Sequence, residues 1–331
     1  MKGRKAGWAA SDAMSWPLLL GSATLAFVIT FVATRWLIEG LRNTRMVGHD
    51  LHKPHRPLIP EMGGLAVIAG FYGGVTTLQL FATEGPTPSY IHASLVAGIG
   101  AGFAGLLDDL FRLRRRAKAI LPFLFAIPLG IVVFRDPQGG TILLGADVGA
   151  LVLLAIPFGI TCAANATNML EGFNGLGAGL GIIMSIAMIG IALATGEFDA
   201  LYIVLPLLGA LVAFLYFNRY PAKVFPGDSM TLFVGAAIAA AAIVAHQKTL
   251  GALLFAPMIL EFFLKARGRF RGENYGEPDS DGKLRYDGRI ESITHAVMRK
   301  RPMKEWGVVA VVWALEGAVV VAVLAAIAIV P

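Results

Sequence analysis

The sequence predicts an all-α polytopic membrane protein, and three observations support this fold class. First, 56% of the 331 residues are apolar and only 15% are charged, whereas soluble proteins carry roughly 25% charged residues; the mean hydropathy is +0.68. Second, the apolar residues form long runs without a charge, as membrane-spanning helices require. Third, these runs do not alternate apolar and polar residues, which disfavours a transmembrane β-barrel. The lone cysteine, Cys162, excludes an internal disulfide and a cysteine-rich zinc site.

About ten charge-poor segments are candidate transmembrane helices. Gly63–Ala82 and Gly172–Gly196 contain no charged residue, whereas the segment at 119–135 is short and contains two prolines, so its ends are the least defined. The first helix is expected to be retained and not cleaved as a signal peptide, and Met1–Trp16 is too short and basic to form an element. We expect one domain over 1–331, a long cytoplasmic loop at 266–305, and helices at 17–38, 63–82, 91–107, 119–135, 148–166, 173–195, 199–217, 229–247, 249–265 and 306–330.

The distribution of basic residues predicts the orientation of these helices. Of the 28 lysines and arginines, 23 fall in the loops that follow odd-numbered helices or at the adjoining helix ends. The positive-inside rule places these loops in the cytoplasm and both termini outside. Basic loops beside anionic headgroups account for the net charge of +6, so the charge does not call for a nucleic-acid partner.

Nearly all of the unusual polar clusters lie in the predicted cytoplasmic loops. A transporter is expected to carry polar groups near the bilayer midplane, on interrupted helices, and a purely structural membrane protein would not need such clusters. Their placement on one face favours an enzyme that takes one substrate from the cytoplasm and another from the membrane. The clusters are Asp50–Lys53 with Glu61, Asp108-Asp109 with Lys118, Asn165–Asn174, Pro226–Ser229 and the 266–305 loop.

Asp108 and Asp109 end the third predicted helix, where the helix dipole disfavours carboxylates. Two adjacent acids in this position favour a bound cation, and Mg²⁺ is the common ion with oxygen ligands. The alternative is a pair of interfacial charges that ends an apolar helix. The basic residues from Arg112 to Lys118 follow directly; most are expected to anchor the helix at the membrane surface, and at least one could contact a phosphate.

The remaining polar motifs each allow two interpretations. Asp228 opens the eighth predicted helix, so it could cap that helix or bind a ligand. Asn165 and Asn168 lie three residues apart, on one helix face, and could bind a ligand or hold neighbouring helices together. The glycines between 172 and 179 suit close helix packing or a backbone approach to a phosphate. Glu316 lies alone in the last helix and is assigned no role.

Together these motifs resemble the polyprenyl-phosphate N-acetylhexosamine-1-phosphate transferases, the superfamily of the bacterial phospho-MurNAc-pentapeptide translocase. The likeness is greatest to the eukaryotic and archaeal dolichyl-phosphate N-acetylglucosamine-phosphotransferases. It covers almost the whole chain: the helices, the five cytoplasmic loops and the order of the motifs. The most specific motifs are Asp108-Asp109 with Lys118, Asn165-Ala-Thr-Asn168 followed by Gly172-Phe-Asn174-Gly, and Phe225-Pro-Gly-Asp228-Ser.

The resemblance implies roles for the residues that match the family motifs. Asn168 and Asp228 match the ligands of Mg²⁺, for which Mn²⁺ is an alternative. Asp108 and Asp109 match an acidic pair, one member of which deprotonates or positions the acceptor phosphate. Lys118 matches the lysine that contacts the donor pyrophosphate.

Further matches imply the contacts to the donor. Leu51, Glu61 and Asn174 match positions that hold the uridine. In the last cytoplasmic loop, Arg269 and Arg271 match two arginines that grip the pyrophosphate and sugar.

The chain departs from the family pattern at two places in the donor site. Phe270 replaces the histidine between the two arginines, so His295 is proposed to supply a histidine from elsewhere, the alternative being an interfacial helix residue. Asn174 is an amide where the bacterial translocase has an acid, and the translocase's run of three histidines is absent. Both departures favour UDP-GlcNAc over the MurNAc-pentapeptide donor.

The implied reaction transfers N-acetylglucosamine-1-phosphate from UDP-GlcNAc to a polyprenyl or dolichyl phosphate and releases UMP. This would be the first lipid-linked step of glycan assembly such as N-glycosylation. Alternatives are another UDP-N-acetylhexosamine donor for a cell-envelope polysaccharide, a multipass transporter, or a membrane prenyltransferase, whose aspartate-rich motifs are missing. We expect a multi-pass protein, in the cell membrane if prokaryotic, with its active site facing the cytoplasm; a homodimer is left open, and no nucleic acid is expected.

Overall fold

The computed structural model describes residues 15–329 apart from 43, 54, 138, 139 and 144. Most of the predicted basic segment Met1–Trp16 therefore lies outside the described residues. The described chain is mainly helical and includes two short 3₁₀ turns, η1 (Gly149–Leu151) and η2 (Phe198–Ala200). The α-helices are α1 (Trp16–Leu41), α2 (Gly64–Phe81), α3 (Pro88–Phe111), α4 (Arg115–Phe134), α5 (Val152–Leu170), α6 (Leu176–Thr195), α7 (Leu201–Asn218), α8 (Gly227–Val244), α9 (Lys248–Leu253), α10 (Ala256–Arg267), α11 (Ile293–Lys300) and α12 (Glu305–Ile329).

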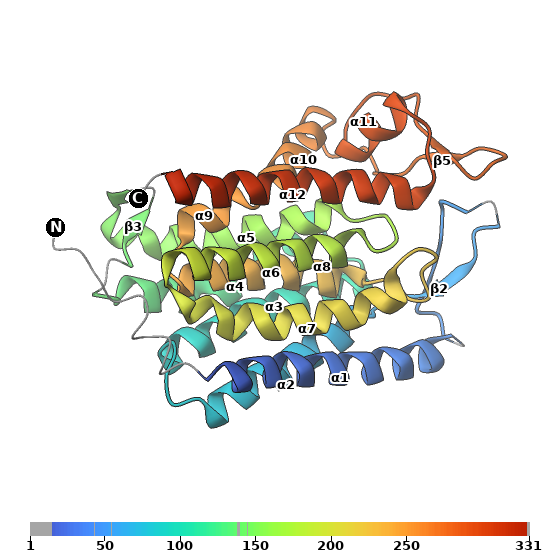
Figure 1. Ribbon diagram of the computed structural model, residues 1–331. Coiled ribbons are helices and arrows are strands. Elements are labelled where there is room, and N and C mark those ends of the chain that lie inside the picture. Colours follow the sequence, from blue (N-terminus) through green and yellow to red (C-terminus); the bar gives the residue numbers. More distant parts are fainter. Residues whose placement is uncertain (1–14, 43, 54, 138–139, 144, 330–331) are drawn as a thin grey trace.

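Within the described residues, nine helices are long and apolar enough to cross a membrane, namely α1–α8 and α12. The predicted fold class, an all-α polytopic membrane protein, is confirmed. The prediction of one continuous helix at 249–265 is wrong, because this segment forms α9 and α10. Pro257 lies in the first turn of α10. A proline is tolerated in the first turn of a helix, but in the middle of one continuous helix it would remove a hydrogen bond and its ring would clash with the preceding turn. Figure 1 shows α9 near the end of the bundle where α8 finishes and α10 toward the opposite end, so the two short helices together still lead the chain back toward that opposite end.

The connection between α5 and α6 is a turn that requires glycine. The predicted helix at 173–195 starts only at Leu176, while α5 extends to Leu170. Gly172 and Gly175 have φ angles of 143° and 85°, a region that side chains strongly disfavour. Asn174 is therefore held in a tight turn, and Asn168 lies on the last turn of α5.

Helix α8 is the central helix of the bundle and packs against α2, α3, α5, α6 and α7. Small residues let the backbones approach closely, as is common between membrane helices. A Cβ atom at Gly105 of α3 would lie 2.3 Å from the carbonyl oxygen of Asp228, and one at Gly235 of α8 would lie 2.3 Å from that of Ala163 in α5. The first contact holds the first turn of α8, which carries Asp228, against α3, and the second packs α8 against α5.

Three short antiparallel hairpins extend from the helices: β1 (Val47–His49) with β2 (Leu58–Pro60), β3 (Ile142–Leu143) with β4 (Ala146–Asp147), and β5 (Glu277–Pro278) with β6 (Leu284–Arg285). The first hairpin pairs Gly48 with Ile59 and is tied to the chain before α8. The Phe225 N–H donates to the Pro60 carbonyl at 2.8 Å, and the Gly63 N–H donates to the Phe225 carbonyl at 3.0 Å. Figure 1 shows β2, β5 and α11 at one end of the bundle, opposite the end where α1 begins and α12 finishes.

Candidate active site

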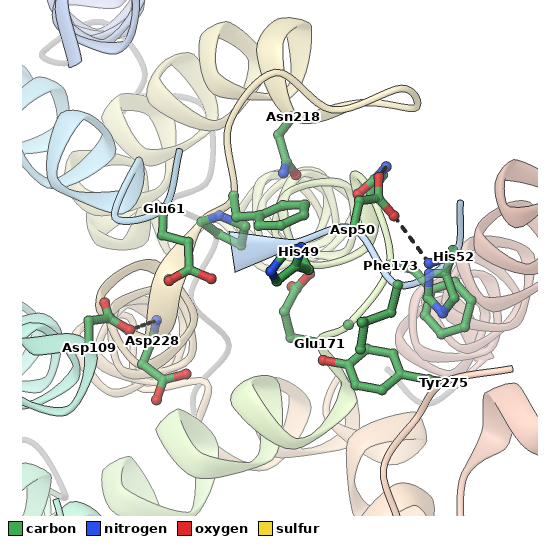
Figure 2. Close-up of a pocket in the computed structure, with 16 residues that line it drawn as sticks. His49, Asp50, His52, Glu61, Asp109, Glu171, Phe173, Asn218, Asp228 and Tyr275 are labelled. Atoms are coloured by element: carbon green, nitrogen blue, oxygen red, sulfur yellow. Dashed lines mark hydrogen bonds between the residues drawn. The ribbon is translucent and has the colours of Figure 1, made fainter. Parts of the chain in front are cut away.

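A cavity of about 250 Å³ lies at the end of the bundle that carries the first hairpin and α11. Its walls come from the first loop, the end of α3, the α5–α6 turn, the start of α8 and the last loop. Figure 2 shows that three of its acidic side chains lie apart from the aromatic ones, whereas Asp50 lies beside His52. The acidic part holds Glu61, Asp109 and Asp228, the aromatic part holds His52, Phe173 and Tyr275, and Glu171 lies between them.

Asp109 binds the N-terminus of α8. The backbone N–H of Asp228 donates to Oδ1 of Asp109 at 2.8 Å (Figure 2), and that of Ser229 donates to Oδ2 at 3.2 Å. The first N–H groups of a helix have no partner within that helix, and a carboxylate there is also stabilised by the helix dipole. The N-cap of α8 is Pro226 and Asp228 lies in the first turn, so Asp228 is not the capping residue that the alternative interpretation expected. Asp109, from a different helix, performs that function.

Asp108, the neighbouring acid, pairs with Lys118. Lys118 Nζ lies 2.8 Å from Asp108 Oδ2 and also contacts Asp228 Oδ2. The Leu113 N–H donates to the other Asp108 oxygen at 2.7 Å, which holds this carboxylate in place. Asp108 and Lys118 do not line the cavity, but they contact Asp228, which does. The structure thus brings together Asp108, Asp109, Lys118 and Asp228, four residues to which the family resemblance assigns roles.

Two glutamates enlarge the acidic part of the cavity. Burial raises the pKa of Glu61, and the negative charge of Asp109 adds to the effect, while Arg112 opposes it. Burial raises the pKa of Glu171 to about 7, partly offset by backbone N–H groups at Gly172 and Gly177. Glu171 Oε2 has no hydrogen-bond partner among the described residues. A carboxylate held this way gains from a nearby cation.

The acidic part is chemically suited to a divalent cation. Carboxylate and amide oxygens are the donors that Mg²⁺ prefers, and Asp228 and Asn168 supply one of each. Thr167, next to Asn168, donates to the carbonyl oxygen of Thr231 at 2.7 Å, which holds the last turn of α5 against the first turn of α8. Glu171 lines the same cavity, its charge interacts with that of Asp228, and its Oε2 has no hydrogen-bond partner among the described residues, so it offers a further oxygen. The residues present therefore fit a metal, although Asn168 does not line the cavity.

A second group of possible metal ligands lies at the other side of the cavity, which Asp50 and His52 line. Asp50, His52 and Glu305 are buried, and their ligand atoms lie within 4.8 Å of one another. The ammonium group of Lys53 contacts Asp50 and lies 3.1 Å from Glu305 Oε2. Because Lys53 already supplies a positive charge here, this group is explained as an ion-pair network and needs no metal.

The other part of the cavity offers flat apolar surfaces and amides. The His52 ring stacks on Phe173 with a centroid distance of 4.3 Å and lies edge-on to Tyr275 at 5.4 Å. Leu51 and Asn174 line the same cavity, so all three residues predicted to hold uridine, including Glu61, border one cavity. Glu61, however, lies beside Asp109, whereas Asp50, to which Asn174 donates a hydrogen bond, lies across the cavity (Figure 2).

The predicted donor contacts in the last loop lie outside the cavity. Arg269 and Arg271 are exposed and do not line it. His295 is buried in this loop, where it stacks on Tyr286 at 3.6 Å and its Nδ1 accepts the Glu291 N–H at 3.3 Å. Burial lowers the pKa of His295. The structure does not bring these three residues to the other site residues, and their roles stay predictions.

Several residues of the site have no role in the sequence-based predictions. Asn274 donates from Nδ2 to the carbonyls of Met169 and Glu171, at 2.9 and 2.6 Å, and so attaches the last loop to the end of α5. Tyr275, the next residue, thereby reaches the cavity. Glu305 reaches the network from the start of α12. Of these residues, Glu171 lies inside the Asn165–Asn174 motif and could have been found there. No signal in the sequence places Asn274, Tyr275 or Glu305 in the site.

Comparison with known proteins identifies the family. Residues 91–246 match glycosyl transferase family 4. A protein of Saccharolobus solfataricus is 40% identical over 299 residues, which are 88% of this chain and 91% of the relative. The chain belongs to glycosyl transferase family 4. The predicted resemblance and the prediction of a membrane glycosyltransferase enzyme are thereby confirmed.

The names of the relatives point to one subgroup of the family. The Saccharolobus protein and one from Sulfolobus acidocaldarius, which is 36% identical over 90% of this chain and 93% of its own, carry the provisional name UDP-N-acetylglucosamine–dolichyl-phosphate N-acetylglucosaminephosphotransferase. A phospho-N-acetylmuramoyl-pentapeptide-transferase of Shouchella clausii is 30% identical over 61% of this chain and 66% of its own. The archaeal relatives thus match more of the chain at higher identity.

Proposed function

We propose that this member of the family transfers N-acetylglucosamine-1-phosphate from UDP-GlcNAc to a polyprenyl or dolichyl phosphate, releasing UMP. The observation that carries the proposal is that the acidic side chains around Asp228 lie apart from the aromatic ones around Phe173, in a cavity that Asn174 also lines. A nucleoside diphosphate has the matching division, with a charged pyrophosphate at one end and a flat base at the other. The names of the archaeal relatives agree with this reaction.

The reaction places demands that these residues can meet. An oxygen of the acceptor phosphate attacks the β-phosphorus of UDP-GlcNAc, the bond from that phosphorus to the bridging oxygen breaks, and UMP leaves with the bridging oxygen. Phosphoryl transfer of this kind depends mainly on positioning and charge neutralisation. Asn168 and Asp228, with the nearby Glu171, would hold a Mg²⁺ ion, which when bound offsets the negative charge of the phosphates.

Lys118 is a cation that contacts Asp228 in the acidic part of the cavity. It bridges Asp108 and Asp228, so a small movement of its ammonium group toward the pyrophosphate would exchange one anionic partner for another. A phosphate monoester is largely dianionic near neutral pH, since its second pKa is about 6. The acceptor therefore does not need a strong base, and Asp108 and Asp109 are proposed to act through position and charge.

The proposal includes the membrane context. The site end of the bundle is the end of the basic loops, so we propose that it faces the cytoplasm, where UDP-GlcNAc is present, while the lipid phosphate is reached from the bilayer. The cell membrane is the proposed location. The polar groups of the cavity lie at the end of the bundle, and this favours catalysis over transport of a solute across the membrane.

The test is an assay with purified protein, UDP-GlcNAc, a polyprenyl phosphate and Mg²⁺, in which UMP and the lipid product are both measured. We expect UMP to form in equal amounts with the lipid-linked sugar phosphate, and only when both substrates are present. Asp281→Asn, in an exposed turn with 69% of its side chain accessible, is the control variant and should keep full activity. Formation of free GlcNAc-1-phosphate without lipid product, or no UMP at all, would refute the proposed reaction.

A further inference from the structure

Asn174 is contacted by two carboxylates from distant parts of the chain. Its backbone N–H donates to Glu305 Oε1 at 2.8 Å. Its side-chain Nδ2 donates to Asp50 Oδ2 at 3.1 Å and lies 3.5 Å from Glu305 Oε2. Asp50 belongs to the first loop and Glu305 to the first turn of α12. All three side chains are at least 94% buried, so water does not replace these contacts.

These carboxylates determine which way the amide of Asn174 faces. An ionised carboxylate only accepts hydrogen bonds, whereas an amide has two N–H donors on one side and an accepting oxygen on the other. Rotating the amide by 180° would place its oxygen against two anions in a buried site, which is strongly unfavourable. The nitrogen is therefore held toward Asp50 and Glu305, and the carbonyl oxygen is the part left for a ligand in the cavity that Asn174 lines.

Lys53 keeps this arrangement electrically balanced. Its ammonium contacts Asp50, lies 3.1 Å from Glu305 Oε2 and sits 4.6 Å above the ring centre of Tyr220. Burial lowers the pKa of Lys53, but its hydrogen bond to Asp50 and the charge of Glu305 more than offset this, so that its pKa is raised. One cation beside the two carboxylates offsets part of their negative charge.

We infer that Asp50 and Glu305 are positioning residues that present Asn174 to the nucleobase as a hydrogen-bond acceptor, and that this orientation selects uracil over cytosine. The inference rests on the proposed function and deepens it. Uracil carries an N3–H donor between two carbonyl oxygens. Cytosine has an unprotonated N3 at the same position, and its lone pair would face the carbonyl oxygen of Asn174. A site built around an acceptor rejects the base that lacks the donor, because the buried oxygen is left unpaired.

The wild-type protein provides the first test. UDP, CDP and N3-methyl-UDP compete for the site, and their affinities are measured by calorimetry in the presence of Mg²⁺. We expect CDP and N3-methyl-UDP to bind at least about tenfold more weakly than UDP, since both lack the N3–H donor. The methylated compound removes this proton and otherwise keeps the uracil ring. Equal binding of UDP and CDP would overturn the inference without any variant.

The second test separates positioning from general structural support. Glu305 does not line the cavity, so Glu305→Gln should act on the base only through Asn174. A glutamine can donate as well as accept, which permits the rotated amide, and we expect the UDP-to-CDP preference to fall roughly three- to tenfold. Asp50→Asn is a second variant with the same expected direction. Glu39→Gln, in an exposed pair with Arg35 on α1, is the matched control and should leave the preference unchanged.

Each outcome has a defined meaning. A purely structural role would lower the unfolding temperature and weaken UDP and CDP alike, so an unchanged preference in both the Glu305 and the Asp50 variant overturns the inference. If neither variant folds, the comparison of UDP with CDP and N3-methyl-UDP on the wild-type protein decides. Wild-type protein that releases UMP from UDP-GlcNAc but does not discriminate these nucleotides refutes only this inference, whereas failure to release UMP refutes the proposed function.

Discussion

Replacing Asp109 distinguishes a helix cap from a proton acceptor. Its carboxylate accepts the N–H groups of Asp228 and Ser229 at 2.8 and 3.2 Å. Asp109→Asn keeps one accepting oxygen and loses one charge-assisted bond, which should cost about 1–2 kcal/mol. Asp109→Ala leaves two partly buried N–H groups without a partner and should cost about 2–4 kcal/mol. Because the first turn of α8 carries Asp228, weakening this cap should displace the Asp228 side chain from its position in the site.

The assay is UMP release as a function of Mg²⁺ concentration, with thermal unfolding measured on the same preparations. If the free energy lost with the cap raises the activation barrier by the same amount, Asp109→Asn should lower kcat/KM about 5- to 30-fold and Asp109→Ala about 30- to 1000-fold. Both variants should require more Mg²⁺ for half-maximal rate, since Asp228 is displaced. The reasoning is refuted if Asp109→Asn abolishes turnover while its unfolding temperature and Mg²⁺ requirement stay at wild-type values. Asp109 would then act on the reacting atoms themselves.

Three further predictions test the metal, the pH dependence and the topology. Asp228→Ala should abolish Mg²⁺-dependent UMP release in a folded protein, and an unchanged Mg²⁺ response would contradict its role as a ligand. The pKa of Glu171 is raised from 4.5 to about 7, so its contribution to stability should be lost as pH rises between these values. In EDTA, the free energy of unfolding should therefore fall by up to about 3 kcal/mol between pH 5 and pH 8, and Glu171→Gln should remove this difference. An unaltered pH dependence of unfolding in the variant would argue against the raised pKa. In a Cys162→Ser background, a cysteine at Ser280 should be labelled from the cytoplasm and one at Pro86 from outside; labelling of both from one side would mean that the number of crossings is wrong.

Local sequence predicted the helices well because charge-free runs of this length have few alternatives in a membrane. The exception is the segment at 249–265, which is interrupted before Pro257. Three other prolines lie inside continuous helices, namely Pro122, Pro157 and Pro206. The presence of a proline therefore does not by itself predict that a helix is interrupted. Whether a helix continues past a proline depends on whether neighbouring groups satisfy the freed backbone carbonyls.

The sequence predicted which motifs meet in the candidate site, but it did not predict the contacts that individual residues make there. The motifs around Asp109, Asn174 and Asp228 were expected to gather because they fall in loops on one side, and the structure brings them together. Which of these acids caps a helix was not predictable, since the N–H groups that Asp109 binds belong to a helix more than a hundred residues away. Arg269 and His295 were placed by resemblance alone, and the structure leaves them outside the cavity.

The sequence by itself determined the membrane class, the helical architecture and the end of the bundle that carries the chemistry. These depend on the spacing of apolar and charged residues, and that spacing is local information. Only the tertiary structure decided that Glu305 and Asp50 meet at Asn174 and that Asn274 attaches the last loop to α5. Such contacts join segments that are far apart in the chain, and a buried polar group takes whichever partner the packing of the helices brings within hydrogen-bonding distance.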